Sequence, residues 1–116
     1  MNAISMIINQ GDIYLANLNP IKGHEQGGYR PVLVIQGNIA NNCLNTVIIV
    51  PLTSNLDAKY KKGTYFISKT ISGLNFDSVA LIFQVRTIDK RRLGKLVATI
   101  PKKDSFDAVN NLMELL

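Results

Sequence analysis

An arginine at the entrance to an apolar run is the strongest candidate for chemistry in this chain. Residues 27–34 read Gly-Gly-Tyr-Arg-Pro-Val-Leu-Val, so Arg30 stands where a polar, glycine-bearing loop enters a predicted strand. Pro31 biases Arg30 toward extended backbone, and a guanidinium offers a rigid fork of donors that suits phosphate or carboxylate. We therefore expect Arg30 to bind an anion, although a surface ion pair is the commoner arrangement for an Arg-Pro pair taken alone.

Three other polar side chains stand at positions where chemistry is possible. Thr53 follows Val50-Pro-Leu52 at the end of an apolar run, where a turn or capping hydroxyl is the ordinary alternative. Gln84 lies inside an apolar segment, so its amide must find partners, line a site or face water at a strand edge. His24 lies in the polar loop before Arg30, where it is either catalytic or an ordinary exposed residue.

Composition narrows the function classes. One histidine and one cysteine make a metal cluster unexpected, so no metal site is predicted. The sequence has no GxxxxGK[ST] run, so no loop that binds a nucleoside triphosphate is predicted. It also does not show whether Glu25 and Asp77 lie close enough to act as a catalytic carboxylate pair. The net charge of +5 suggests a polyanionic partner, and the single cysteine favours a reducing cytosol.

Short apolar runs alternate with turn-forming residues, which is typical of a β domain. The length of 116 residues and 47% apolar content fit one domain over residues 1–116. Gly37–Asn45 and Asn55–Gly63 are expected to be loops, Ser72–Asp77 a turn, and Ile4–Ile8 a strand or ordered arm too short to cross a membrane. The expected strands are Asp12–Leu18, Pro31–Gln36, Thr46–Val50 ended by Pro51, Thr64–Ile67, Ser78–Val85 and Leu93–Ile100.

The segment after Pro101 has a different, helical pattern. Asp104 or Ser105 is expected to cap the helix, and its apolar stripe is expected to pack mostly on its own barrel. Short strands followed by one amphipathic helix favour a small, strongly bent antiparallel β-barrel with a C-terminal α-helix on it. The stripe consists of Phe106, Val109, Leu112, Met113 and Leu116.

The order of these segments is more specific than any one of them. The succession resembles the MazF/PemK family of toxin endoribonucleases, which belong to type II toxin–antitoxin systems, over nearly the whole chain from Gly11 onward. Two blocks are specific in combination, and nothing in them suggests an inactive enzyme. They are Glu25-Gln-x-x-x-Arg-Pro31 and Asp77-Ser-Val…Gln-x-Arg-Thr-Ile-Asp89. The other segments that carry the resemblance are Gly11-Asp-Ile-Tyr14, Leu18-Asn-Pro20, the whole of Gly23–Gln36, Val50-Pro-Leu-Thr-Ser54 and Asp77–Gly94.

The resemblance implies an SH3-like β-barrel assembled as a two-fold homodimer. It implies sequence-specific, metal-independent cleavage of single-stranded RNA in the cytoplasm, without a cofactor and without a membrane partner. It also implies a cognate antitoxin whose C-terminal segment occupies the RNA groove, and DNA binding only in complex with that antitoxin. By position, Arg30 and Thr53 match the catalytic pair, and His24 falls where the family varies and some members have serine. The positions that line or support the RNA site are Glu25, Gln26, Ser78 and Gln84.

Residue chemistry agrees with this assignment. RNA is cut without metal when its own 2′-hydroxyl attacks the adjacent phosphorus, which gives a 2′,3′-cyclic phosphate and a 5′-hydroxyl. Arg30 and Thr53 can stabilise the charge that gathers on the phosphoryl oxygens. A guanidinium is protonated at neutral pH and is therefore a poor general base. The general base is expected to be Glu25, His24 or another group. The lysines of the Asn55–Gly63 loop that could hold phosphates, or simply face solvent, are Lys59, Lys61 and Lys62.

Two other function classes fit a small basic barrel. One is a nucleic-acid-binding module that does not cut, which electrostatics alone could support. The other is a protein-interaction domain, because SH3-like barrels often bind peptides and fold does not determine function. The presence of both Arg30 and Thr53 in their motifs favours the enzyme.

Overall fold

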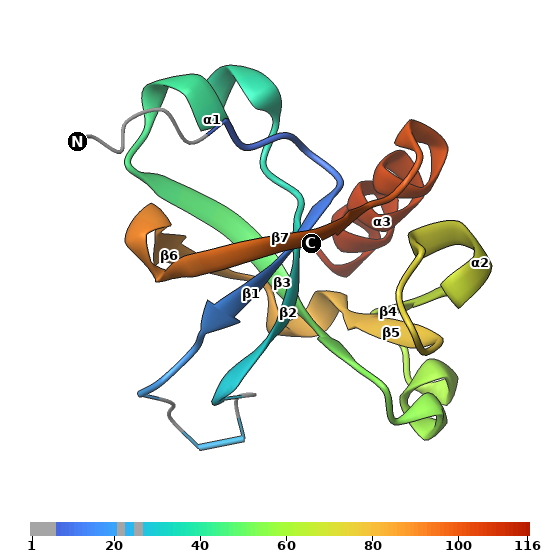
Figure 1. Cartoon of the computed structure of the whole chain (residues 1–116). Helices are drawn as coiled ribbons and strands as arrows, with labels where there is room; N and C mark the ends of the chain where they lie inside the picture. Colours follow the sequence, from blue (N-terminus) through green and yellow to red (C-terminus); the bar gives the residue numbers. More distant parts are fainter. Residues whose placement is uncertain (1–6, 21–22, 25–26) are drawn as a thin grey trace.

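A computed structural model describes residues 7–20, 23–24 and 27–116 as a mainly β structure with a C-terminal helix (Figure 1). In this described part, no helix is long and apolar enough to cross a membrane. The strands are β1 (Asp12–Asn17), β2 (Tyr29–Val34), β3 (Thr46–Thr53), β4 (Thr64–Ile67), β5 (Ser78–Leu81), β6 (Arg86–Asp89) and β7 (Leu93–Thr99). The helices are α1 (Asn38–Cys43), α2 (Lys69–Ser72) and α3 (Lys102–Leu115), with 3₁₀ turns η2 (Leu56–Tyr60), η3 (Ile82–Gln84) and η4 (Lys90–Arg92).

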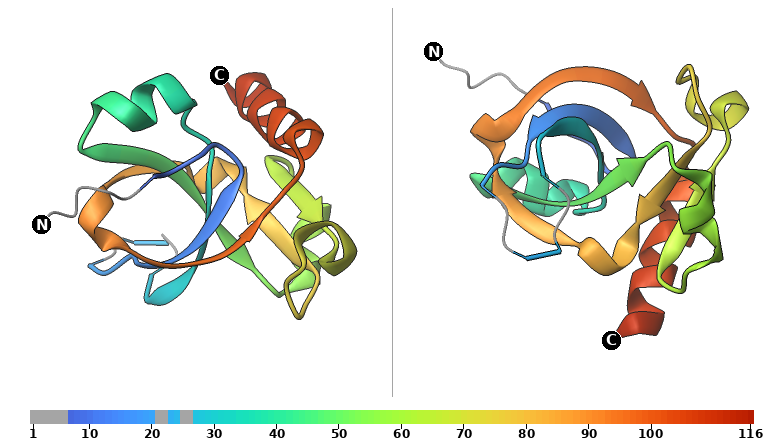
Figure 2. Two further views of the ribbon diagram at one scale, coloured as in Figure 1. Left: turned by 45° about the horizontal axis from the view of Figure 1, so that its top comes forward. Right: turned by 90° about the horizontal axis from the view of Figure 1, so that it is seen from below.

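The strands pair antiparallel in the order β4-β5-β3-β2-β1-β7, and β6 also pairs with β3. The sheet curls round on itself, as the second view of Figure 2 shows. Among the described residues, no ladder joins β6 to β7, which are linked only by the η4 turn. The predicted barrel is therefore a strongly bent antiparallel sheet, with α3 packed on its outside.

Both faces of the central strands are buried, because the sheet encloses one core and supports a second. Tyr14, Val32 and Val34 lie in the enclosed core. Their neighbours Ile13 and Leu33 point the opposite way, into a core that α3 covers. Alternate residues of a strand point to opposite faces, so two cores explain why the segment that includes β2 is apolar at nearly every position.

The expectation that Pro51 ends its strand is wrong, because β3 continues to Thr53. The Thr46–Ile49 part of β3 pairs with β6, whereas Leu52 and Thr53 pair with β5. Pro51 lies at this change of partner, where its missing N–H interrupts neither ladder. The extra length places Thr53, one of the predicted site residues, on a strand.

Two other predicted elements differ from the structure. Ser78–Val85 is not one strand: β5 ends at Leu81, and η3 redirects the chain so that β6 pairs with the other half of β3. The predicted loop Gly37–Asn45 contains α1, because the Asn41 side chain is buried and exchanges hydrogen bonds with Gln36 (2.9 Å each). The strand or arm predicted at Ile4–Ile8 lies mostly outside the described residues.

Helix α3 is rotated relative to the prediction. Ser105 and Ala108 are buried and Val109 and Leu112 pack on the core, which is an i, i+3, i+4, i+7 pattern. Three stripe residues predicted to pack inward instead face solvent, namely Phe106, Met113 and Leu116. The reason is the close approach of α3 to the turn before β1. A Cβ at Gly11 (φ +96°) would collide with the Ser105 hydroxyl, so Ser105 must be at the contact.

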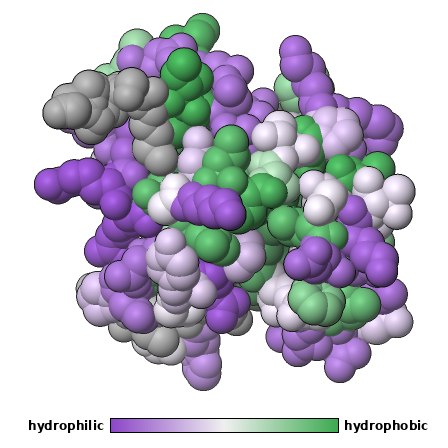
Figure 3. Space-filling model, viewed as in Figure 1, coloured by the Kyte–Doolittle hydropathy of each residue, from purple (hydrophilic) through white to green (hydrophobic). Residues whose placement is uncertain are grey.

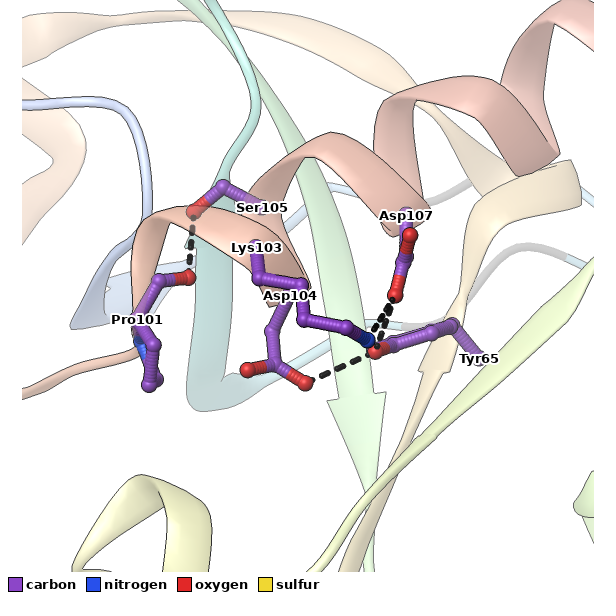
Figure 4. A network of polar contacts seen from close by, with 6 residues as sticks. All are labelled: Tyr65, Pro101, Lys103, Asp104, Ser105 and Asp107. Atoms are coloured by element: carbon purple, nitrogen blue, oxygen red, sulfur yellow. Dashed lines mark hydrogen bonds and ion pairs between the residues drawn. The ribbon is translucent and has the colours of Figure 1, made fainter.

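The start of α3 is held by a tertiary hydrogen bond and not by a side-chain cap. The helix begins after Pro101 without a side-chain cap, so the prediction for Asp104 or Ser105 is wrong. The hydroxyl of Tyr65 on β4 instead donates to Asp104 Oδ1 at 2.8 Å (Figure 4). Burial and the neighbouring carboxylates of Asp104 and Asp107 raise the pKa of Tyr65 well above its ordinary value.

Candidate active site

Arg30 lies near the start of β2 with its guanidinium fixed by two backbone carbonyls. Its Nε donates to the Gly27 oxygen at 2.9 Å, and its Nη1 donates to the Leu52 oxygen at 3.4 Å. Among the described residues it forms no ion pair, so the alternative of a surface ion pair is not seen there. Because a guanidinium has five N–H donors, most of them stay available to a ligand of negative charge.

Thr53 is brought to Arg30 by the pairing of two strands. In the β2–β3 ladder Val32 lies opposite Pro51, and Arg30 and Thr53 each lie two residues beyond this pair at the same end of the ladder. Thr53 Oγ1 accepts a hydrogen bond from the Asn55 amide at 3.1 Å. This bond uses a lone pair of the hydroxyl oxygen and leaves its proton for donation to a ligand.

A first cavity, of about 420 Å³, has Arg30 and Thr53 in its wall. Ser78, at the start of β5, lines the same cavity and is nearly buried. The structure therefore brings three of the predicted site residues together. The remaining lining residues are Pro31, Leu52, Ser54, Leu74, Asn75 and Phe76.

Thr53 also lines a second cavity, of about 420 Å³. His24, Lys61 and Gln84 line it, together with the aromatic ring of Phe83. Gln84 Nε2 donates to the His24 carbonyl oxygen at 3.3 Å, so this amide supports the backbone of the loop before Arg30. Thr53 is the residue common to both cavity linings, so a bound strand could pass from one cavity to the other across it.

The remaining predicted residues are placed less directly. Lys59 and Lys62 are exposed on the segment after β3 and line neither cavity at Thr53. The Lys59 ammonium lies 5.4 Å from the centre of the Tyr60 ring and 5.7 Å from that of Phe66. The predictions for Glu25 and Gln26 fall outside the described residues.

Sequence reasoning missed the aromatic and amide residues that line the cavities around Arg30 and Thr53. Phe76 and Asn75 belong to a segment that turn chemistry alone had explained, and Phe83 lay within a predicted strand. An aromatic residue in a polar turn is a signal that could have identified Phe76, since such a side chain has little reason to face water. Phe83 gave no comparable signal, because only the break at η3 turns it outward.

Comparison with known proteins supplies an independent view of this arrangement. Residues 9–116 match the family model described as PemK-like, MazF-like toxin of type II toxin-antitoxin system. The chain is 47% identical over 111 residues to Endoribonuclease EndoA of Bacillus subtilis (strain 168), which covers 95% of this chain and 94% of that protein.

Solved structures agree on the fold. The crystal structure of MazF (Form-I) from Deinococcus radiodurans superimposes with a TM-score of 0.81 at 26% identity, covering 95% of this chain and 96% of that one. The crystal structure of MazE-MazF (Form-II) from the same organism gives a TM-score of 0.73 at 28% identity with the same coverage.

Proposed function

Since the chain belongs to the PemK-like, MazF-like toxins of type II toxin–antitoxin systems and is an endoribonuclease of that family, we propose that it cuts single-stranded RNA at Arg30 and Thr53. Cleavage is proposed to be sequence-specific, to need no metal ion and to act on mRNA in the cytoplasm. One observation carries this proposal. A fixed arginine without a carboxylate partner among the described residues shares a cavity with a hydroxyl donor.

In the proposed reaction the RNA supplies its own nucleophile. The 2′-oxygen forms a bond to phosphorus as the bond from phosphorus to the 5′-oxygen breaks. The 2′-proton goes to a general base, and the leaving 5′-oxygen takes up a proton. Arg30 and Thr53 donate to the phosphoryl oxygens, where negative charge is greatest in the transition state. The base is His24, Glu25 or another group, and of the two named only His24 lies among the described residues, at the second cavity.

The two cavities that meet at Thr53 suggest how the RNA lies. Nucleotides on either side of the cut would occupy one cavity each, with Lys61 near a phosphate in the second cavity. A cognate antitoxin is the second proposed partner, and its C-terminal segment would occupy the same groove. With a net charge of +5 on the toxin, that segment is expected to be acidic or amphipathic. DNA would be bound only by the toxin–antitoxin complex.

A two-fold homodimer is part of the same proposal. The outer side of α3 and the end of the chain expose apolar side chains. Figure 3 shows separate hydrophobic surface in the middle of the opposite face, since the views of Figure 2 place the C-terminal end of α3 behind that face. Exposed apolar residues grouped in this way favour burial against another protein. The exposed residues concerned are Phe106, Met113, Leu115 and Leu116.

Incubation of the purified protein with a long transcript in EDTA tests the proposed function directly. We expect discrete cuts that leave 5′-hydroxyl ends. An oligonucleotide with 2′-deoxyribose at the mapped cut position should bind but stay intact, and one with 2′-deoxyribose away from the cut should be cleaved normally. Efficient cutting of an all-DNA strand, or a strict need for Mg²⁺, would contradict the mechanism.

A further inference from the structure

An exposed phenylalanine stands at the edge of the cavity that holds the catalytic pair. Phe76 is 70% exposed, yet it lines the same cavity as Arg30 and Thr53. A large apolar ring in water is unfavourable unless something covers it in the working state. Asn75, also exposed, lies beside it in the same wall and carries both an amide donor and an acceptor.

The turn that carries Phe76 is held at both ends. On one side, Gly73 ends α2 in the left-handed conformation (φ +80°), and Leu74 then packs on the core. On the other side, Asp77 Oδ1 accepts a hydrogen bond from the Lys69 amide at 2.8 Å. With Leu74 turned inward and Asp77 tied to α2, the backbone of Phe76 is fixed before any ligand arrives. A side chain on a fixed backbone loses less conformational freedom when a flat ligand binds on it than one on a mobile loop.

We propose that Phe76 is a stacking platform for a base of the RNA next to the scissile phosphate, with Asn75 at the edge of that base. This inference rests on the proposed function and adds a specificity-determining residue to it. Aromatic side chains bind single-stranded RNA by stacking on its bases, while neighbouring polar groups read the base edges. Each of the two cavities that Thr53 lines then has one exposed aromatic ring, because Phe83 (45% exposed) lines the second.

Position in the groove favours RNA over a purely apolar partner as the occupant of Phe76. The ring shares its cavity with an arginine that has no carboxylate partner among the described residues, so a ligand covering it also meets that charge. A nucleotide satisfies both features at once, since its phosphate lies within one nucleotide of its base. A purely apolar partner would leave Arg30 unpaired in a desolvated site, which is costly.

Binding can be measured apart from cleavage because the chain contains no tryptophan. Phe76→Trp introduces a single tryptophan at the platform, and its emission can be excited separately from that of the four tyrosines. We expect its emission to be quenched by an RNA oligonucleotide that spans a mapped cut site and carries 2′-deoxyribose at the cut. Phe66→Trp is the matched control, since Phe66 on β4 is 42% exposed and lines neither cavity at Thr53. Equal responses from the two variants would overturn the proposal.

Cleavage assays provide the second test. Phe76→Ala should weaken binding of that oligonucleotide about 5–150-fold, the range expected for loss of one base stack. It should also broaden the base preference at one position beside the cut, while Phe76→Tyr and Phe66→Ala stay near the wild type. If the wild type cuts RNA and Phe76→Ala keeps its affinity and cut pattern, the stacking role is wrong. If the wild type cuts no RNA in EDTA, the proposed function fails instead.

Discussion

Replacement of Arg30 by alanine is the most direct test of the proposed catalytic pair. The side chain makes two hydrogen bonds, to the Gly27 and Leu52 carbonyls, and the substitution removes both. Each contributes about 1 kcal/mol to the free energy of unfolding, so the expected destabilisation is about 1–2 kcal/mol. Against a typical stability of about 5–15 kcal/mol, the variant should remain folded.

The effect of Arg30→Ala on catalysis should be much larger than its effect on stability. Loss of one donor to a transition-state oxyanion costs about 10²–10³ in rate, which corresponds to about 2.7–4 kcal/mol. Arg30 provides several donors and a positive charge beside Thr53, so we expect a loss at or beyond the upper end of this range. Arg30→Lys keeps the charge but loses the fixed fork, and should recover only part of the rate.

The assay is single-turnover cleavage of an RNA oligonucleotide spanning a mapped cut site, with urea unfolding of each variant alongside. Arg91→Ala is the matched control. This substitution also removes one positive charge. Arg91 is exposed, its Nη2 lies 3.0 Å from Asp89 Oδ2, and it lines neither cavity at Thr53. Wild-type cleavage by Arg30→Ala would refute the assignment. An equal loss in Arg91→Ala would show that net charge, and not the placed guanidinium, governs the rate.

Three further predictions follow from the same structure. Thr53→Ala should cleave about 10²–10³-fold more slowly, whereas Thr53→Ser should stay close to the wild type; equal rates for all three would exclude a role for the hydroxyl. Tyr65→Phe should lower the free energy of unfolding by about 1 kcal/mol at pH 8, because it removes the bond to Asp104. Since the folded state raises the pKa of Tyr65, the stabilisation by its hydroxyl is complete below a pH of about 10 and declines as the pH rises further. The difference in free energy of unfolding between the wild type and Tyr65→Phe, measured in urea, should therefore narrow in strong alkali. Sedimentation at micromolar concentration should show a dimer, and an active 12.8 kDa monomer would contradict the proposed assembly.

The sequence by itself determined most strands and predicted Arg30 and Thr53 as the catalytic pair. Local rules were sufficient for β1, β4 and β7, because short runs that contain apolar residues and are bounded by Gly, Pro, Asn or other turn-forming residues leave few other conformations. The pair was found through motif order. Its residues stand in two short blocks whose internal spacing does not depend on the rest of the fold.

Tertiary structure decided how the elements change partner and which faces they bury. No local signal shows that β3 passes through Pro51, since that depends on where β6 gives way to β5 beside it. Nor does periodicity fix the rotation of α3: a helix with apolar residues on a broad arc can turn several ways, and the contact between Ser105 and Gly11 selected one.

The site shows the same division. Arg30 and Thr53 are separated in sequence by β2, α1 and most of β3, and only the β2–β3 register brings them to one cavity. Phe76 joins them because β5 pairs with the end of β3 and carries the preceding turn with it. Residue type is a local property that a sequence states directly. Proximity between distant segments depends on long-range pairing, and that pairing is set by burial over the whole sheet.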